Sequence, residues 1–269
     1  MFSPQEISEK FIDIGKGKAD LCLHKALLLA LLAGMYIALA AVGANTGSSM
    51  IENPSLAKIV SSMIFPAGLA MVVLAGSELF TGDCLMIISA GEGAISWKKM
   101  LRCWALVYIG NFVGSVLVAF LMTQAHQYSL FGNGVALVTM KTAVAKVSLA
   151  PLSALILGVF CNFLVCVAVW IAAGGNSVTE KLASVYLPIF LFVVCGFEHS
   201  VANMYYIPAG IFAAGDPVYA AAAKGIDTSI LTWGNFFINN LIPVTIGNII
   251  GGCILVGAVY KKCYPKKKA

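Results

Sequence analysis

The chain has 269 residues, 60% of them hydrophobic and only 11% charged, with a formal net charge of +5 at pH 7. Charged residues make up about a quarter of a typical soluble domain, so the composition excludes that class and indicates an integral membrane protein. The surplus lysines lie at the edges of apolar runs and in the C-terminal tail, which favours an orientation signal over nucleic-acid binding. Eight dispersed cysteines without a CxxC or Cys/His cluster indicate small buried hydrophobic residues, with neither disulfides nor metal ligands.

Six apolar stretches of membrane-spanning length, about 20 residues or more each, follow an N-terminal segment. This segment, residues 1–23, lacks the residue order of a cleavable signal peptide, and we expect it to form an amphipathic cytoplasmic helix. The second and fifth stretches are too long and too interrupted to be single helices, so we expect broken helices there. The predicted spans are residues 24–44, 60–91, 100–123, 148–173, 183–213 and 236–259, followed by a basic tail at 260–269.

The distribution of basic residues predicts the orientation of the chain. With both termini in the cytoplasm, all of the 17 lysines and arginines are cytoplasmic except Lys58, Lys141, Lys146 and Lys224. This asymmetry satisfies the positive-inside rule. Lys141 and Lys146 then fall in a predicted outer loop between the third and fourth spans.

Two pairs of short motifs indicate an internal repeat. The sequence "YIGNFVG" at 108–114 returns as "TIGNIIG" at 245–251, and "AGSELFTG" at 75–82 parallels "CGFEHSVA" at 195–202. Residues 24–123 and 148–259 therefore form two repeats of three spans, and the odd number of spans inverts one repeat relative to the other. Inverted repeats with broken helices near the membrane midplane are typical of transporters and channels. We expect an all-α membrane protein of six transmembrane helices, arranged as two inverted three-helix repeats.

The stretch "GFEHSVANM" at 196–204 places Glu198 and His199 inside an apolar run, where a charge costs about 2.5–3.5 kcal/mol. Such a pair could serve as the acid and base of an intramembrane enzyme. The sequence offers no convincing nucleophile motif and no clustered carboxylates, so we expect no catalytic residue and no metal site. A channel for neutral solutes is a closer alternative, although the paired "NPA" motifs of aquaporins are absent.

Three motifs resemble those of the formate/nitrite transporter family: "LAGSELFTG" at 74–82, "GVFCNFLVCVA" at 158–168 and "GFEHSVANM". They occur in the family's order and on the matching spans, so the resemblance covers essentially the whole chain. It implies a homopentamer of aquaporin-like protomers in a prokaryotic inner membrane, without a cofactor. Each protomer would have its own pore for small monovalent anions such as formate, nitrite or hydrosulfide. The sequence leaves open which anion crosses and whether transport is passive or proton-coupled.

The resemblance also implies roles for polar residues at the two breaks. His199 and Thr81 would face each other at the centre of the pore, with the histidine tuning the pH dependence. Lys146, sixteen residues before Asn162, would attract anions at the outer vestibule. Asn162 and Asn203 would donate hydrogen bonds to an anion or to exposed carbonyls, and the sequence does not separate these roles.

Apolar and bracing residues complete the expected site. By resemblance, an outer constriction consists of Phe65, Val165 and Phe192, and a cytoplasmic constriction of Leu69, Leu79 and Phe80. Apolar rings of this kind oppose hydrated ions. Structural support at the helix breaks is expected from Glu78, Glu198 and Asn248.

Overall fold

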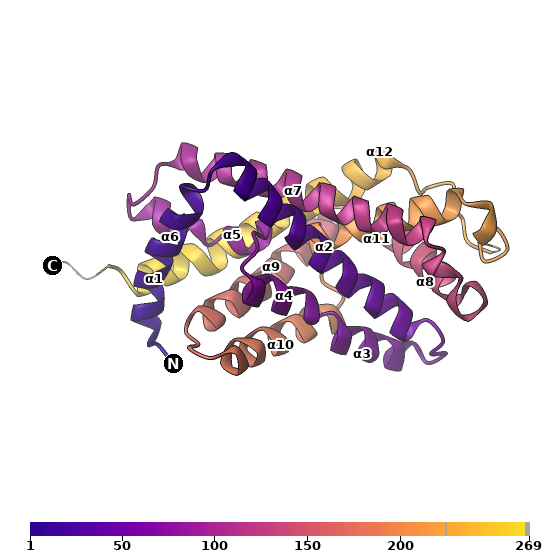
Figure 1. Cartoon of the computed structure of the whole chain (residues 1–269), viewed down its shortest axis with the longest axis horizontal. Helices are drawn as coiled ribbons and strands as arrows, with labels where there is room; N and C mark the ends of the chain where they lie inside the picture. The colour runs from indigo at the N-terminus through magenta and orange to yellow at the C-terminus, as the bar shows by residue number, and fades with distance from the viewer. Residues whose placement is uncertain (224, 267–269) are drawn as a thin grey trace.

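The computed structural model describes residues 1–223 and 225–266, and every regular element within these ranges is helical (Figure 1). Lys224 and the last three residues of the basic tail lie outside the described residues. The N-terminal segment contains helix α1, Pro4–Ala19. The side chains of Ser3 and Glu6 form a reciprocal capping box at its start, which satisfies backbone N–H groups that have no partner within a helix.

Five helical stretches in the described ranges are long and apolar enough to cross a membrane. They are Leu23–Ser48 (α2), Pro54–Ala75 (α3, Pro54–Ile64, and α4, Ala67–Ala75), Trp97–Gln124 (α7), Pro151–Ala173 (α9) and Trp233–Cys263. The last stretch combines α12 (Trp233–Asn235), α13 (Ile242–Ile249) and α14 (Val259–Cys263) with π-helical turns at Phe236–Leu241 and Ile250–Ala258. The fifth predicted span is instead divided into two shorter helices, α10 (Val178–Val194) and α11 (Ser200–Gly215).

Two glycines end the helices that precede the breaks. Gly76 follows α4 with φ of 75°, and Gly196 follows α10 with φ of 72°. Glycine adopts this left-handed conformation without a Cβ penalty. After three further residues, new helices begin at Phe80 (α5, Phe80–Asp83) and at Ser200 (α11). The prediction that the second and fifth spans are broken is confirmed, and α6 (Met86–Gly91) completes the second span.

The predicted outer loop between the third and fourth spans is wrong in one respect. After a short 3₁₀ turn at Gln127–Ser129, this stretch forms helix α8, Leu130–Val147, which is interrupted by left-handed residues at 131–133. Residues Val135, Ala136, Thr139, Met140, Ala143 and Val147 are buried at helical spacing. This buried stripe packs against α11, at the end of the molecule away from α1 (Figure 1).

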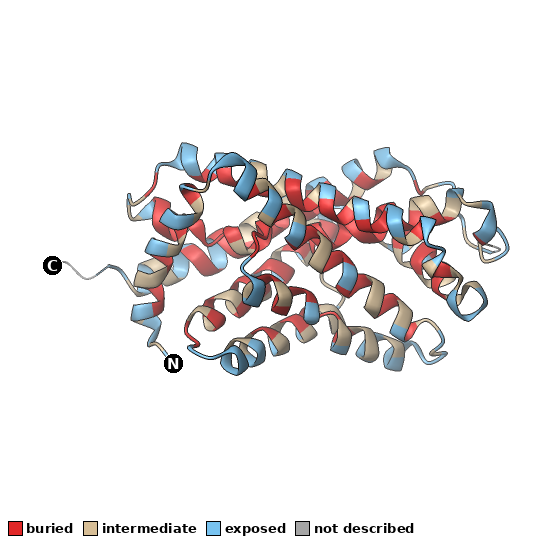
Figure 2. Ribbon diagram, viewed as in Figure 1, coloured by how far each residue is buried: buried red, intermediate tan, exposed pale blue. Residues whose placement is uncertain are grey.

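Buried residues follow the lines where helices meet, and exposed residues cover the outside of the bundle (Figure 2). Many exposed side chains are apolar, among them Leu28, Leu32, Leu39, Phe120 and Phe160. An apolar exterior of this extent suits lipid or subunit contacts better than water.

The expectation of buried cysteines holds for part of the set. All eight thiols are free, and five are buried. Cys22, Cys195 and Cys263 are exposed, so the expectation is wrong for these three. Each of them lies at or beyond a helix end, where neighbouring helices give less cover.

The first and last helices meet on one side of the molecule. The Trp170 ring of α9 stacks on Phe11 of α1 at 5.2 Å and on Tyr260 of α14 at 4.2 Å between ring centroids. The Ser8 hydroxyl donates to the Tyr264 carbonyl at 2.8 Å, and the Gln5 amide donates to the Pro265 carbonyl at 2.8 Å. Both ends of the chain are therefore fixed to the same face, which we call the termini side.

Candidate functional site

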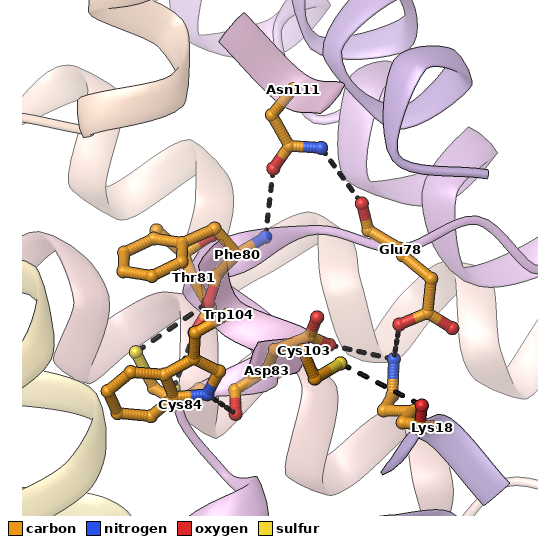
Figure 3. Close-up of polar contacts among 10 residues, drawn as sticks. Lys18, Glu78, Phe80, Thr81, Asp83, Cys84, Cys103, Trp104 and Asn111 are labelled. Atoms are coloured by element: carbon orange, nitrogen blue, oxygen red, sulfur yellow. Dashed lines mark hydrogen bonds and ion pairs between the residues drawn. The ribbon is translucent and has the colours of Figure 1, made fainter. Parts of the chain in front are cut away.

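The break in the second span is held by Asn111 of α7, a residue in the first copy of the repeated motif. Its Oδ1 accepts a hydrogen bond from the Phe80 backbone N–H at 2.9 Å (Figure 3). Its Nδ2 donates to the backbone carbonyls of Glu78 at 2.9 Å and Ala30 at 2.7 Å. One buried amide thus satisfies backbone groups on both sides of the break, which have no partner within a helix.

Asn248 of α13 makes the corresponding contacts at the break in the fifth span. It accepts from the Ser200 N–H at 2.9 Å and donates to the carbonyls of Glu198 at 3.0 Å and Gly158 at 2.8 Å. The Asn162 amide donates in turn to the Asn248 carbonyl at 2.7 Å. The side-chain amides of Asn162 and Asn248 therefore contact backbone carbonyls in this structure.

Glycines beside these asparagines allow the helices to approach closely. A Cβ at Gly114 would collide with the Leu31 carbonyl of α2, and one at Gly251 would collide with the Val159 carbonyl of α9. Small residues at helix contacts are typical of membrane proteins, because backbones can then come within van der Waals distance. The glycines of the repeated motif place each asparagine within reach of its break.

The carboxylates at the breaks contact lysines. Glu78 pairs with Lys18 of α1, which also donates to Asp83 at 2.8 Å (Figure 3). Burial acts to lower the pKa of Lys18, but the charges of Asp83 and Glu78 and their hydrogen bonds to the amine raise it above its ordinary value. Lys18 is therefore a permanent cation in this cluster.

Glu198 lies in a similar cluster on the opposite side of the molecule. Its Oε1 accepts from Lys146 of α8 at 2.7 Å, and its Oε2 accepts from Asn203 at 2.6 Å and from Asn240 at 3.3 Å. The Lys146 amine also lies 5.3 Å from the centroid of the Tyr206 ring. Lys146 and Asn203 thus both contact the carboxylate of Glu198.

Thr81 and His199 join the two breaks directly. The Thr81 Oγ1 and the His199 Nε2 are 2.9 Å apart, and both residues are buried. His199 is also the N-cap of α11, where its Nδ1 accepts from the Ala202 backbone N–H at 3.0 Å. Because Nδ1 is an acceptor, a neutral ring carries its hydrogen on Nε2, and Thr81 accepts the hydrogen bond.

Two cavities approach this pair from opposite sides. The larger, about 490 Å³, is lined by His199, Asn203, Lys58 and Lys146 and ends at Phe65 and Phe192. The rings of Phe65 and Phe192 lie edge to face, 5.7 Å apart.

The smaller cavity, about 280 Å³, opens on the termini side and is lined by Lys10, Lys18, Lys181, Glu78, Leu69 and Leu79. Phe65 and Leu69 are one helical turn apart, a rise of about 6 Å. A thin apolar layer therefore separates the two spaces.

The remaining predicted residues are buried among the helices. Val165 is buried on α9, and the Phe80 ring packs on Tyr108 at 4.8 Å and on Trp104 at 5.8 Å. Among the described residues that line the cavities, Val165, Phe80, Thr81 and Asn162 do not appear. In this conformation, Phe65 and Phe192 face one cavity, and Leu69 and Leu79 face the other.

Sequence reasoning missed several residues of the site. Asn111 was available from the repeat, because it aligns with Asn248 in the paired motifs. Lys18 and Asp83 gave no local signal, since their pairing joins α1 to the distant α5. Asn240 and Lys58 likewise become visible only when α8 and α3 are placed around the larger cavity.

Comparison with known proteins places the chain in a family. The family model described as formate/nitrite transporter matches residues 5–261. The chain belongs to the formate/nitrite transporter family. The resemblance seen in the three motifs is thereby confirmed.

Curated members of the formate/nitrite transporter family align with nearly the whole chain. The formate channel FocA of Escherichia coli K12 is 39% identical over 97% of this chain and 94% of its own length. A probable formate transporter of Methanothermobacter thermautotrophicus is 38% identical over 98% of both chains. A solved structure described as a pentameric formate channel with formate bound has 36% identity and a TM-score of 0.84, covering 91% of this chain and 98% of that one. These relatives are described as channels or transporters, not as enzymes.

Proposed function

We propose that the chain forms a channel for small monovalent anions in an inner membrane, with a separate pore in each subunit of a homopentamer. The observation that carries the proposal is the pair of cavities on either side of the Thr81–His199 hydrogen bond. The larger cavity reaches His199, and the smaller reaches Leu79 and Gly82, which flank Thr81 in the chain. The relatives described as formate channels support formate as a substrate.

The thin apolar layer sets what can pass. A hydrated ion loses water between Phe65 and Leu69, and an apolar layer offers no replacement for that water. Formate, nitrite and hydrosulfide are small and carry one charge, which keeps the desolvation cost low compared with that of a divalent anion. The cost that remains is offset by donors at the breaks, where backbone N–H groups at the start of α11 carry partial positive charge.

Thr81 is the donor that meets the anion in this proposal. Its oxygen accepts from His199 Nε2, so its hydroxyl hydrogen is free to point at an anion crossing the apolar layer. A modest movement of the turn that carries Thr81 would bring this hydroxyl into the pathway. His199 would then donate to Thr81 while Thr81 donates to the anion, and we call this chain of two hydrogen bonds the relay.

His199 tunes the pH dependence through its two nitrogens. A proton added to the ring must go to Nδ1, which then can no longer accept from the Ala202 N–H. Protonation therefore breaks the N-cap hydrogen bond of α11, which costs about 1 kcal/mol. The charge of the ring thus affects the stability of the helix that begins at the break. A neutral ring leaves the anion charged, whereas a protonated ring can transfer its proton to the anion, so that the neutral acid leaves and the ring becomes neutral again.

The arrangement proposed for the membrane has six spans in two inverted repeats, with both termini in the cytoplasm. The matching hydrogen bonds of Asn111 and Asn248 support the repeat, and the lysine distribution supports the orientation. A cysteine-depleted variant that keeps Cys263 or carries Ser148→Cys tests it. An impermeant thiol reagent applied to intact cells should label residue 148 and spare residue 263, and the opposite pattern would reverse the orientation.

Flux through reconstituted liposomes tests the function and the role of the histidine together. Formate, nitrite and hydrosulfide should compete for one path while sulfate stays outside. His199→Asn, which keeps a polar group but cannot titrate, should conduct without the parent's response between about pH 5 and 8. His199→Phe should change selectivity as well. Rapid sulfate flux would contradict the substrate class, and an unchanged pH profile in His199→Asn would remove the titration role.

A further inference from the structure

We propose that Lys58 of α3 is the residue that collects anions in the larger cavity and gives this cavity its net positive charge. The inference rests on the proposed anion channel and names the residue that sets its capture step on this side. The family resemblance implies this role for Lys146, but in the structure the amine of Lys146 forms an ion pair with Glu198.

Among the described residues, the charged side chains that line the larger cavity are Lys58, Lys146 and Glu198. Lys146 and Glu198 are joined at 2.7 Å, and their side chains are only 15% and 6% exposed. Opposite charges this close cancel at the distance of an approaching anion. The Lys146 amine thus donates a hydrogen bond to the Glu198 carboxylate and also lies over the Tyr206 ring. One positive charge, that of Lys58, is therefore left to act over the cavity.

Lys58 makes no ion pair within 4.0 Å in the part of the chain that the structure describes. Its side chain is exposed, and it lines the same cavity as the Lys146–Glu198 pair. Lys58 lies inside the stretch Pro54–Ala75, which is apolar enough as a whole to cross a membrane. A lysine in such a helix is costly unless it faces water or a partner, and here it faces the cavity.

The position of Lys58 suits capture better than tight binding. It lies two helical turns before Phe65, about 10 Å along the helix axis from the apolar layer. At that distance an ammonium group attracts an anion into the cavity without holding it there. A cleft with low-dielectric walls strengthens this attraction, and from Coulomb's law we expect about a 2- to 10-fold enrichment of anions at low salt.

Salt is the variable that separates capture from structure. The Debye length is about 30 Å at 0.01 M and about 3 Å at 1 M ionic strength. Lys58 should therefore increase anion flux at about 0.01 M ionic strength and have no effect on it at about 1 M. A purely structural role for the side chain would not depend on salt in this way.

The experiment compares Lys58→Gln with the parent and with Lys141→Gln in liposomes of the full-length protein. Lys141 is an exposed lysine of α8 that does not line the larger cavity, so its replacement makes the same change in net charge away from the path. Formate flux is measured at about 0.01 M and 1 M ionic strength, and the ratio of the two is taken within each sample. This ratio cancels differences in the amount of folded protein.

The ratio of low-salt to high-salt flux should fall about 2- to 10-fold in Lys58→Gln and stay at the parent value in Lys141→Gln. Lys58→Arg, which keeps the charge, should restore it. An unchanged ratio in Lys58→Gln beside a conducting parent would overturn the inference while the proposed channel stands. A parent that conducts neither formate nor nitrite would overturn both.

Discussion

Replacing Asn111 by leucine tests how much of the fold depends on the asparagine at a helix break. The change removes an acceptor for the Phe80 N–H and donors to the carbonyls of Glu78 and Ala30. Hydrogen bonds between helices in membrane proteins contribute on average about 0.6 and at most about 1.7 kcal/mol each. Three such bonds predict a loss of roughly 2–5 kcal/mol in the free energy of unfolding.

Denaturant titration in detergent micelles, followed by tryptophan fluorescence, measures this loss. Asn239→Leu is the matched control, because Asn239 is half-buried and makes one long hydrogen bond, 3.4 Å, to Asn235. We expect this control to lose less than about 1 kcal/mol. Asn248→Leu should match Asn111→Leu, since its three backbone contacts are equivalent. If Asn111→Leu and Asn239→Leu differ by less than about 0.5 kcal/mol, the asparagine does not hold the break.

Further substitutions, centred on Thr81, Cys166 and Lys18, probe contacts around the same break. Thr81→Val, which removes the acceptor of the His199 Nε2–H, should lower formate flux in liposomes several-fold, whereas Thr81→Ser should keep it; equal flux in both would refute the relay. Cys166→Ala should cost about 0.5–1.5 kcal/mol of unfolding free energy, because the thiol donates to the Thr81 carbonyl at 3.3 Å, and Cys166→Ser should recover it. Lys18→Gln leaves two buried carboxylates unpaired and should destabilise by about 3 kcal/mol, and adding Glu78→Gln should recover part of that loss in the same titration.

Local signals predicted the broken helices well. Gly76 and Gly196 appear in the sequence as the first residue of a G-x-E motif after an apolar run, and both adopt the left-handed conformation that ends a helix. His199 stood out because a titratable residue inside an apolar run needs a reason. These features depend on a few adjacent residues, which is why the sequence alone revealed them.

Features that depend on distant contacts were not predicted. Helix α8 lies in the predicted outer loop, and the reason for its buried stripe becomes visible only when the helix is packed against α11. The pairing of Lys146 with Glu198 joins residues 52 positions apart and reverses the electrostatic reading of that lysine. The sequence shows that Lys146 is present before the fourth span, but it does not show that Glu198 is its partner.

The contacts between α1 and the C-terminal tail have a consequence for biogenesis. Gln5 and Pro265 are 260 positions apart, so the nascent first helix leaves the ribosome long before its docking surface exists. Lys10 and Lys18 of this helix line the smaller cavity. The Tyr264 carbonyl that accepts the hydrogen bond of Ser8 becomes available only after this part of the chain has been translated. A chain that ends before Tyr260 would therefore lack the carbonyl groups that hold α1 beside the smaller cavity. Truncation before Tyr260 should expose α1 to proteases that the intact protein resists, so the folding of α1 depends on residues 260–265.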